Sequence, residues 1–171
     1  MDMPTLSLAL RIALILVLLP VLFVGVSLVW NHPPLFDAPG ISARLKTYLT
    51  THIAETRENH PFPELRPHRF AVQPEVLFRF SRQTVSDMGW SVSGVEPTAY
   101  QLTAVATTGL WRFKDNVTLR VYTSPDGGSI LYVRSESQVG KGDLGANIRR
   151  VLDLTHRIER QIAEQERRKN N

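Results

Sequence analysis

The 171-residue sequence predicts an α+β protein, with one N-terminal transmembrane helix followed by a two-layer domain. A long uncharged run lies near the N-terminus. The middle of the chain alternates apolar and polar residues, and the C-terminal part repeats apolar residues every three or four positions. We therefore expect a four-stranded antiparallel meander with helices on one face and a long C-terminal helix.

Composition restricts the classes of function. Hydrophobic residues make up 43% of the chain and charged residues 21%, which is typical of a folded protein. The absence of cysteine excludes disulfides, cysteine–metal sites and thiol catalysis. The net charge of +4 is small and its carriers are dispersed, so we predict no nucleic-acid partner.

The run from Ile12 to Trp30 contains no charged residue and is nearly long enough to span a hydrocarbon core of roughly 30 Å. Trp30 lies where an interfacial aromatic residue is expected, and a membrane helix tolerates Pro20. We predict an N-terminal flank at 1–11 and a retained anchor at 12–30. A cleaved signal peptide is the alternative, although the run is long for one and no small-x-small cleavage site follows it.

Positive charges around the anchor predict its orientation. Arg11 precedes the run directly, whereas Arg44 and Lys46 are the first positive residues after it. This bias favours a cytoplasmic N-terminus. For a bacterial chain it predicts a single-pass inner-membrane protein whose C-terminal domain is periplasmic.

The segment 31–40 is rich in proline and predicts a semi-rigid linker. From 41 to 171 we expect one α+β domain with a fraying C-terminal tail. Its first element is a helix capped by Ser42 and reaching about Thr56. The proline-punctuated segment 57–69 is expected to be a connector on the surface.

Pro74 begins the next predicted helix, and Gly89 ends it. A hairpin turn is predicted at 124–129, between the third and fourth strands. The predicted strands contain Trp90 and Val92, Tyr100 to Ala106, Val117 to Tyr122, and Leu131 to Arg134. The final helix carries an apolar stripe of Leu144, Ile148, Val151, Thr155, Ile158 and Ile162.

Gly140, Gly142 and Gly145 follow the spacing G-x-G-x-x-G, which is typical of dinucleotide sites. A Rossmann site also needs a second parallel strand and an acidic residue about 20 positions further on. The chain after Gly145 keeps a helical pattern, so we predict no nucleotide and no cofactor. The glycines instead allow a sharp bend, with Asp143 capping the helix and Gly145 letting the helix approach the sheet closely. An anion at this helix N-terminus, beside Lys141, is the open alternative.

Four stretches carry a family resemblance: HPFPELRP (60–67), GW (89–90), FKDNV (113–117) and VRSESQVGKGDLGANIRR (133–150). Over roughly 60–160 the chain resembles the domain-of-unknown-function 1499 family of small bacterial and plastid-related proteins. The resemblance implies no activity, because that family has no established one. Related sequences often have basic residues where this chain has Glu136 and Gln138, so a strongly cationic loop is not implied.

Polar residues of the last motif are expected to converge with Asp115 where the hairpin meets the final helix. One hypothesis is that Arg134 and Arg150 clamp a carboxylate or phosphate. The alternative is that Arg134 pairs with Asp115 or Asp143 while Asn147 ties down the loop. The candidate ligand-binding residues are Asp115, Arg134, Ser135, Ser137, Lys141, Asp143, Asn147 and Arg150.

We predict no catalytic and no metal-binding residues. The chain contains no G-x-S-x-G motif, Ser137 and Lys141 do not have the spacing of S-x-x-K, and the histidines lack metal-ligand spacing. The predicted role is a non-catalytic binding or scaffolding module at the membrane surface. One alternative is a carrier of a lipid or small apolar or anionic ligand, which needs a cavity between the sheet and the helices. The other is a small hydrolase dependent on Ser135 and Ser137.

The second face of the sheet is a candidate interface, because tyrosine and arginine are enriched at protein interfaces. A protein partner or lipid headgroups are expected to contact it through Arg120, Tyr122, Tyr132 and Arg134. The alternative is that the helix at 42–56 covers this face. The side chains expected there are Thr118, Arg120, Tyr122, Ile130, Tyr132 and Arg134.

Overall fold

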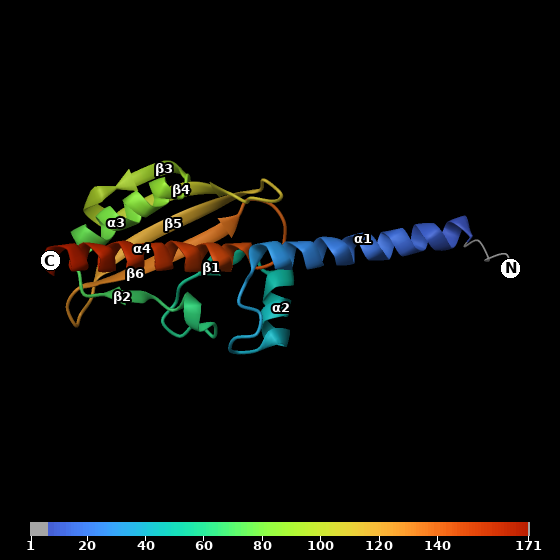
Figure 1. Cartoon of the computed structure of the whole chain (residues 1–171), viewed down its shortest axis with the longest axis horizontal. Helices are drawn as coiled ribbons and strands as arrows, with labels where there is room; N and C mark the ends of the chain where they lie inside the picture. The colour runs from blue at the N-terminus through green and yellow to red at the C-terminus, as the bar shows by residue number, and fades with distance from the viewer. Residues whose placement is uncertain (1–6, 171) are drawn as a thin grey trace.

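The computed structural model describes residues 7–170. The predictions for residues 1–6 and 171 therefore lie outside the described residues. The helices are α1 (Leu8–Asn31), α2 (Ile41–Thr50), η1 (Pro63–Leu65), α3 (Pro74–Asp87), η2 (Pro97–Ala99) and α4 (Ala146–Asn170). The strands are β1 (Ile53–Glu55), β2 (His68–Phe70), β3 (Ser91–Glu96), β4 (Gln101–Thr107), β5 (Lys114–Thr123) and β6 (Ser129–Ser137). The predicted α+β class is confirmed (Figure 1).

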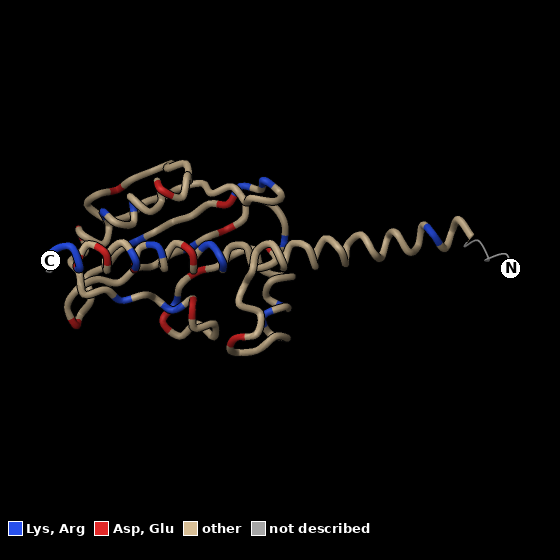
Figure 2. The backbone as a smooth tube through the Cα atoms, viewed as in Figure 1, with Lys and Arg blue, Asp and Glu red and all other residues tan. Residues whose placement is uncertain are grey.

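Helix α1 projects away from the rest of the molecule and is long and apolar enough to cross a membrane (Figure 1). It has 24 residues, and its most apolar window has a mean hydropathy of 3.0 and is only 6% buried. Ser7 caps it by accepting a hydrogen bond from the Leu10 amide at 3.4 Å, and Pro20 lies within it. Arg11 is its only charged residue, whereas charges of both signs are spread over the domain (Figure 2).

The strands form one antiparallel sheet in the order β1-β6-β5-β4-β3. Strands β3 to β6 are the predicted meander. Two short strands that were not predicted, β1 and β2, share the outer edge of β6 and pair with its end and its beginning. The sheet therefore has six strands, not four.

The predicted helix to Thr56 is wrong at its C-terminal end, and its N-cap residue is Gly40, not Ser42. Helix α2 stops at Thr50, and Ile53–Glu55 instead forms β1 with Ala54 opposite Ser135. Without this pairing β6 would be an edge strand with unpaired backbone groups, and long-range pairing overrides the local helical pattern.

The predicted surface connector at 57–69 is also wrong in part. Phe62 and Leu65 are 3% and 2% exposed and belong to the hydrophobic core. His68–Phe70 pairs with β6 as β2. The prolines keep this segment out of regular helix, but its apolar side chains still pack inward.

Helices α3 and α4 cover one face of the sheet, which confirms the predicted two-layer arrangement (Figure 1). Helix α3 begins at Pro74 as expected and ends before Gly89, whose φ is +69°. Helix α4 is described to Asn170, and fraying of the last residues stays a prediction. All residues of its predicted stripe are buried, but Leu144 lies before the first residue of α4, with a φ of +53°, and is not part of the helix; the stripe residues are Leu144, Ile148, Val151, Thr155, Ile158 and Ile162.

Candidate functional site

The predicted polar site lies where β5 and β6 meet the first turns of α4. Alternate residues of a strand point to opposite faces, so Ser135 and Ser137 face the helices. Asp115 lies opposite Ser137 in the β5–β6 register and faces the same way. Asn147 and Arg150 are three residues apart in α4, which places both on the helix face above these strand residues.

Asn147 is at the centre of this cluster and is completely buried. Its Oδ1 accepts a hydrogen bond from Ser135 Oγ at 2.6 Å. Its Nδ2 donates to Ser137 Oγ and to the backbone carbonyl of His52, both at 2.9 Å. The amide thus joins α4 to β6 and to the residue before β1, and not to the loop that it was expected to tie down.

Arg150 and Asp115 form a buried ion pair, with side chains that are 9% and 0% exposed. Arg150 Nη2 donates to Asp115 Oδ2. Arg150 Nη1 donates to Ser135 Oγ at 2.9 Å and also to Asn147 Oδ1. A buried charge is tolerated when it is paired and hydrogen-bonded, so this network holds both charged side chains in place.

One oxygen of the network has no partner. Asp115 Oδ1 is buried, and within residues 7–170 no group donates a hydrogen bond to it. An unsatisfied buried polar atom costs about 1–3 kcal/mol, and more when it is charged. Such atoms are rare in native proteins. Asp115 Oδ1 is therefore an acceptor that the described part of the chain leaves unsatisfied.

Asp115 lines a cavity of about 270 Å³. Most of its lining comes from three parts of the chain: the C-terminal half of α1, the β4–β5 loop (108–113), and the segment 138–145 between β6 and α4, which we call the glycine bend. Aromatic rings of the first two segments make much of the wall. The lining residues are Phe23, Ser27, Asn31, Thr108, Leu110, Trp111, Phe113, Asp115, Ser137, Val139, Gly140, Gly142, Asp143, Leu144 and Ala146.

Direct contacts hold α1 against the domain at this cavity. The Trp111 ring lies 4.8 Å from the Phe23 ring, centroid to centroid, and its Nε1 donates to Ser27 Oγ at 2.9 Å. Asn31, the last residue of α1, donates from Nδ2 to the Leu144 carbonyl at 3.1 Å. The end of α1 is therefore fixed to both the loop and the glycine bend.

Asp143 caps α4 as predicted. Its carboxylate accepts the backbone amides of Gly145 and Asn147, each at 2.9 Å. Burial raises the pKa of Asp143 above its usual value of 3.8, although these amide hydrogen bonds act in the opposite direction. The donors that an anion would use are occupied by the cap, so the geometry does not favour the anion site proposed beside Lys141.

The glycines of the bend have a structural role, but not quite the predicted one. We expected Gly145 to bring α4 close to the sheet. Instead, a Cβ on Gly145 would lie 2.6 Å from Pro33 Cβ, and one on Gly142 would lie 2.3 Å from the Leu49 carbonyl oxygen. The bend therefore packs against the linker after α1 and against α2, with Gly145 at a φ of +78°.

Two of the predicted site residues lie outside the cluster. Arg134 alternates with Ser135 and so points to the opposite face, where it pairs with Glu136 at 2.8 Å and Glu55 at 3.2 Å. The expected clamp of Arg134 with Arg150 is not formed, and Arg134 pairs with neither Asp115 nor Asp143. Lys141 is exposed on the glycine bend.

The sequence model of a family described as "Protein of unknown function (DUF1499)" matches residues 29–158. The chain belongs to this family. The match confirms the resemblance seen over 60–160 and extends it back to the end of α1. The DUF1499 region thus includes the whole polar cluster, the glycine bend and the β4–β5 loop. No curated protein matches the chain.

The N-terminal part of the DUF1499 region contains a second buried cluster, which sequence reasoning missed. Arg44 of α2 is fully buried and pairs with Glu64 at 2.5 Å. It also donates to Tyr48 Oη at 3.1 Å and stacks 4.4 Å from the centroid of the Phe62 ring. Arg44 and Tyr48 are four residues apart, so an arginine on the inward face of an amphipathic helix was the available signal. Every partner is within the chain, which makes this cluster structural.

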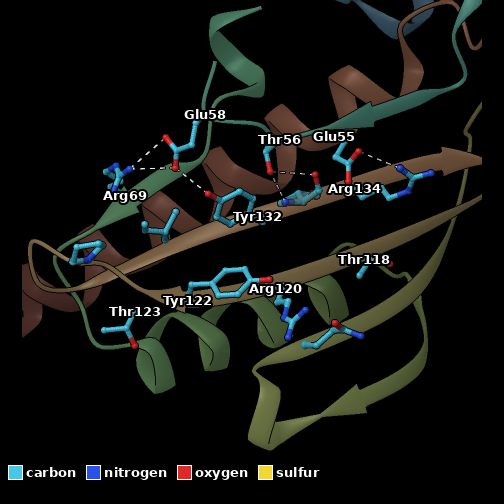
Figure 3. A pocket seen from close by; sticks show the side chains of 14 residues that line it. Glu55, Thr56, Glu58, Arg69, Thr118, Arg120, Tyr122, Thr123, Tyr132 and Arg134 are labelled. Carbon is cyan, nitrogen blue, oxygen red and sulfur yellow. Dashed lines mark hydrogen bonds and ion pairs between the residues drawn. The ribbon is translucent and has the colours of Figure 1, made fainter. Parts of the chain in front are cut away.

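The face of the sheet opposite α3 and α4 forms the open face of the DUF1499 domain, with a shallow depression of about 690 Å³ (Figure 3). The expected side chains gather there: Tyr122 and Tyr132 pack edge to face at 5.3 Å, and Arg120 lies 5.1 Å from the Tyr122 ring. No residue of α2 lines the depression, so the alternative of a covering helix is wrong; from the segment 42–56, Glu55 and Thr56 line its edge as part of β1 and the residue after it. Glu58 accepts from Tyr132 Oη at 2.9 Å and pairs with Arg69 at 3.3 Å.

Both serines of the cluster are hydrogen-bonded to the side-chain amide of Asn147. Ser135 Oγ donates to Asn147, and Ser137 Oγ accepts from the same amide. His52 contributes only its backbone carbonyl to this network. Among residues 7–170, no group of three or more acidic or histidine side chains is placed to hold a metal ion.

Proposed function

We propose that this protein is a single-pass membrane protein whose domain is a non-catalytic binding module at the membrane surface. We further propose that the cavity of about 270 Å³ receives the polar head of a lipid-like amphipathic molecule. One observation carries this proposal: the unpartnered, buried Asp115 Oδ1 belongs to a residue that lines a cavity walled by the apolar helix α1.

The chemistry of the cavity defines the ligand. Arg150 already neutralises the Asp115 carboxylate, so the ligand needs a hydrogen-bond donor, such as a hydroxyl or amine, and not necessarily a full positive charge. Phe23, Trp111 and Phe113 offer apolar surface for the part of the ligand next to that donor. The volume is slightly below that of typical ligand pockets, about 300–1,000 Å³, so it suits a headgroup and not a whole lipid.

The hydrolase alternative has less support. A nucleophilic serine needs a base within hydrogen-bond distance. Ser135 and Ser137 instead bond to an amide and a guanidinium group, and neither group accepts a proton near neutral pH. A carrier that holds the same ligand is compatible with the cavity and differs from a fixed binding module only in whether the ligand is released.

The proposal is tested by filling the cavity. Ala146 lines it at the start of α4, and a leucine there would occupy space that a ligand needs. The full-length chain, extracted in a mild detergent, would be studied by native mass spectrometry. We expect the wild type to carry an added mass of lipid size and Ala146→Leu to lose it.

Ala163→Leu is the matched control, because Ala163 is exposed on the same helix far from the cavity. We expect it to keep the added mass and the melting temperature of the wild type. A clean protein mass for both the wild type and the control would contradict ligand binding. Retention of the ligand by Ala146→Leu would show that the ligand binds elsewhere.

The orientation in the membrane is part of the same proposal. Arg44 and Lys46 are the first two positive residues after the apolar run. Because the buried Arg44 is neutralised by Glu64, only Lys46 of these two adds a free positive charge on the domain side. Arg11 still precedes the apolar run, which favours an inner-membrane protein with a periplasmic domain. A C-terminal alkaline phosphatase fusion should be active, and an inactive fusion would place the domain in the cytoplasm.

We propose as a second candidate that the open face binds a protein partner through Arg120, Tyr122, Tyr132 and Arg134. Arg120 is exposed and contacts an aromatic ring instead of a carboxylate. Strands β5 and β6 run along the long axis of the domain, so this face extends away from α1 (Figure 1). That direction favours a protein over lipid headgroups. A photo-crosslinker at Tyr122 should capture the partner in intact membranes, and one at Gln83 on α3 should not.

A further inference from the structure

We infer that the end of the domain next to α1 is inserted into the lipid interface, with the β4–β5 loop as the part that penetrates. This end of the domain contacts the same bilayer that α1 crosses. The inference rests on the proposed membrane anchor, but it does not depend on a ligand in the cavity.

The depth of Trp111 carries the inference. Its ring packs on Phe23 and bonds to Ser27, which lie eight and four residues before the end of α1. At about 1.5 Å per residue, these contacts lie roughly 6 to 12 Å inside the helix end, measured along the axis. The uncharged run from Ile12 to Trp30 is only about 28 Å long, so nearly all of it is needed to cross a core of roughly 30 Å. The loop must then reach the level of the lipid.

The contact with Trp111 also shields a polar residue of α1 from lipid. Ser27 is a polar residue in the apolar run, and it is 2% exposed because the domain covers it. Trp111 Nε1 donates a hydrogen bond to its hydroxyl oxygen, as a polar group in hydrocarbon requires. The other side of the Trp111 ring is free to contact lipid, since the residue is 43% exposed. Tryptophan at the membrane interface has this arrangement of a bonded N–H and an apolar ring.

Exposed apolar residues gather at the same end. Phe113 of the loop is 48% exposed and Val139 of the glycine bend is 67% exposed. Ile41 and Leu49 of α2 are 49% and 44% exposed. Helix α2 lies across the direction of α1, where α1 meets the domain (Figure 1). A helix in that position lies along the membrane surface when α1 crosses it.

The charges at this end match the headgroup region. Arg112 and Lys114 flank the exposed ring of Phe113, and Lys141 lies on the glycine bend. Lys46 is exposed on α2. Figure 2 shows positive residues in the loop, in the bend and on α2, close to the point where α1 leaves the domain. Positive side chains beside apolar side chains that are exposed on the protein are typical of a surface that binds anionic headgroups.

Site-directed spin labelling tests the depth directly. The chain has no cysteine, so single variants of the full-length protein can carry one nitroxide each. The protein would be placed in nanodiscs of phosphatidylcholine and phosphatidylglycerol. Accessibility to oxygen, which concentrates in lipid, is compared with accessibility to a water-soluble nickel chelate. The test positions are Phe113→Cys and Val139→Cys. Leu19→Cys in α1 is the reference for a label inside the lipid, and Asp126→Cys in the distant β5–β6 turn is the reference for a label in water.

We expect oxygen to exceed nickel accessibility several-fold at positions 113 and 19, with the reverse at 126. Position 139 should be intermediate, at headgroup depth. A lipid signal at 19 with an aqueous signal at both 113 and 139 would overturn the insertion while leaving the anchor intact. An aqueous signal at 19 would overturn the anchor and the insertion together. Neither outcome depends on whether the cavity carries a ligand.

Discussion

Single residues of the polar cluster differ in how far sequence could predict their contacts. The cap by Asp143 was predictable, because its partners Gly145 and Asn147 are within four residues. The partners of Arg134 were not, because they depend on the pairing of β1 with β6 and on the face to which Arg134 points. The convergence of Asp115, Ser135 and Arg150 was predicted, yet the free oxygen of Asp115 required the structure.

Asn147→Ala should lower the free energy of unfolding by about 2–3 kcal/mol, because it removes the acceptor of the Ser135 hydroxyl, the donor to Ser137 Oγ and one of the two donors to the His52 carbonyl. Denaturant unfolding in detergent micelles, followed by circular dichroism, measures this change. Asn116→Ala is the control, since Asn116 is exposed on the open face, and it should change the free energy by less than about 0.5 kcal/mol. Equal losses in both variants would contradict the central role of Asn147.

Asp143 should make stability depend on pH. Its pKa is raised by burial in the folded protein, so it contributes stability below the unfolded pKa that is lost as the pH rises through the folded pKa. Asp143→Asn does not titrate. The wild type should therefore exceed the variant most in free energy of unfolding in acid, near the usual pKa of 3.8, and the difference should shrink toward neutral pH. A difference that grows with pH would mean that the cap hydrogen bonds dominate over burial.

At the scale of elements, sequence predicted those whose pattern is local. The boundaries of α3, the meander and the buried stripe of α4 follow from periodicity, prolines and glycines. Strands β1 and β2 were missed because each has three residues and exists only by pairing with a distant strand. The sequence predicted that the glycines of the bend have a structural role. It did not predict that the bend packs against α2 and the linker, because the spacing of glycines does not identify their neighbours.

Gly142→Ala tests the packing of the bend on α2. Its Cβ would lie 2.3 Å from the Leu49 carbonyl oxygen, a backbone atom that cannot move away without shifting α2. We expect a loss of about 1–3 kcal/mol in the free energy of unfolding and faster hydrogen exchange at the amides of α2. Gly25→Ala is the control, since nothing lies within 4 Å of its Cβ. Unchanged exchange in α2 would show that the bend does not hold that helix.

At the scale of the whole molecule, the cavity is made by segments that only the fold brings together. The half of α1 near Phe23, the loop at Trp111 and the bend at Gly142 are far apart in the sequence, so sequence predicted a carrier cavity only as an alternative and in a different place, between sheet and helices. The anchor itself was predictable from an uncharged run. Its firm attachment to the domain, through Trp111 and Asn31, was not.

The central claim is that α1 stays attached and holds the domain at the membrane. The most direct test is the intact mass of the protein in membrane and soluble fractions after a carbonate wash of the membranes. We expect a chain of 19.3 kDa that remains in the membrane fraction. A shorter chain that begins near Asn31 and is recovered in the soluble fraction would contradict it.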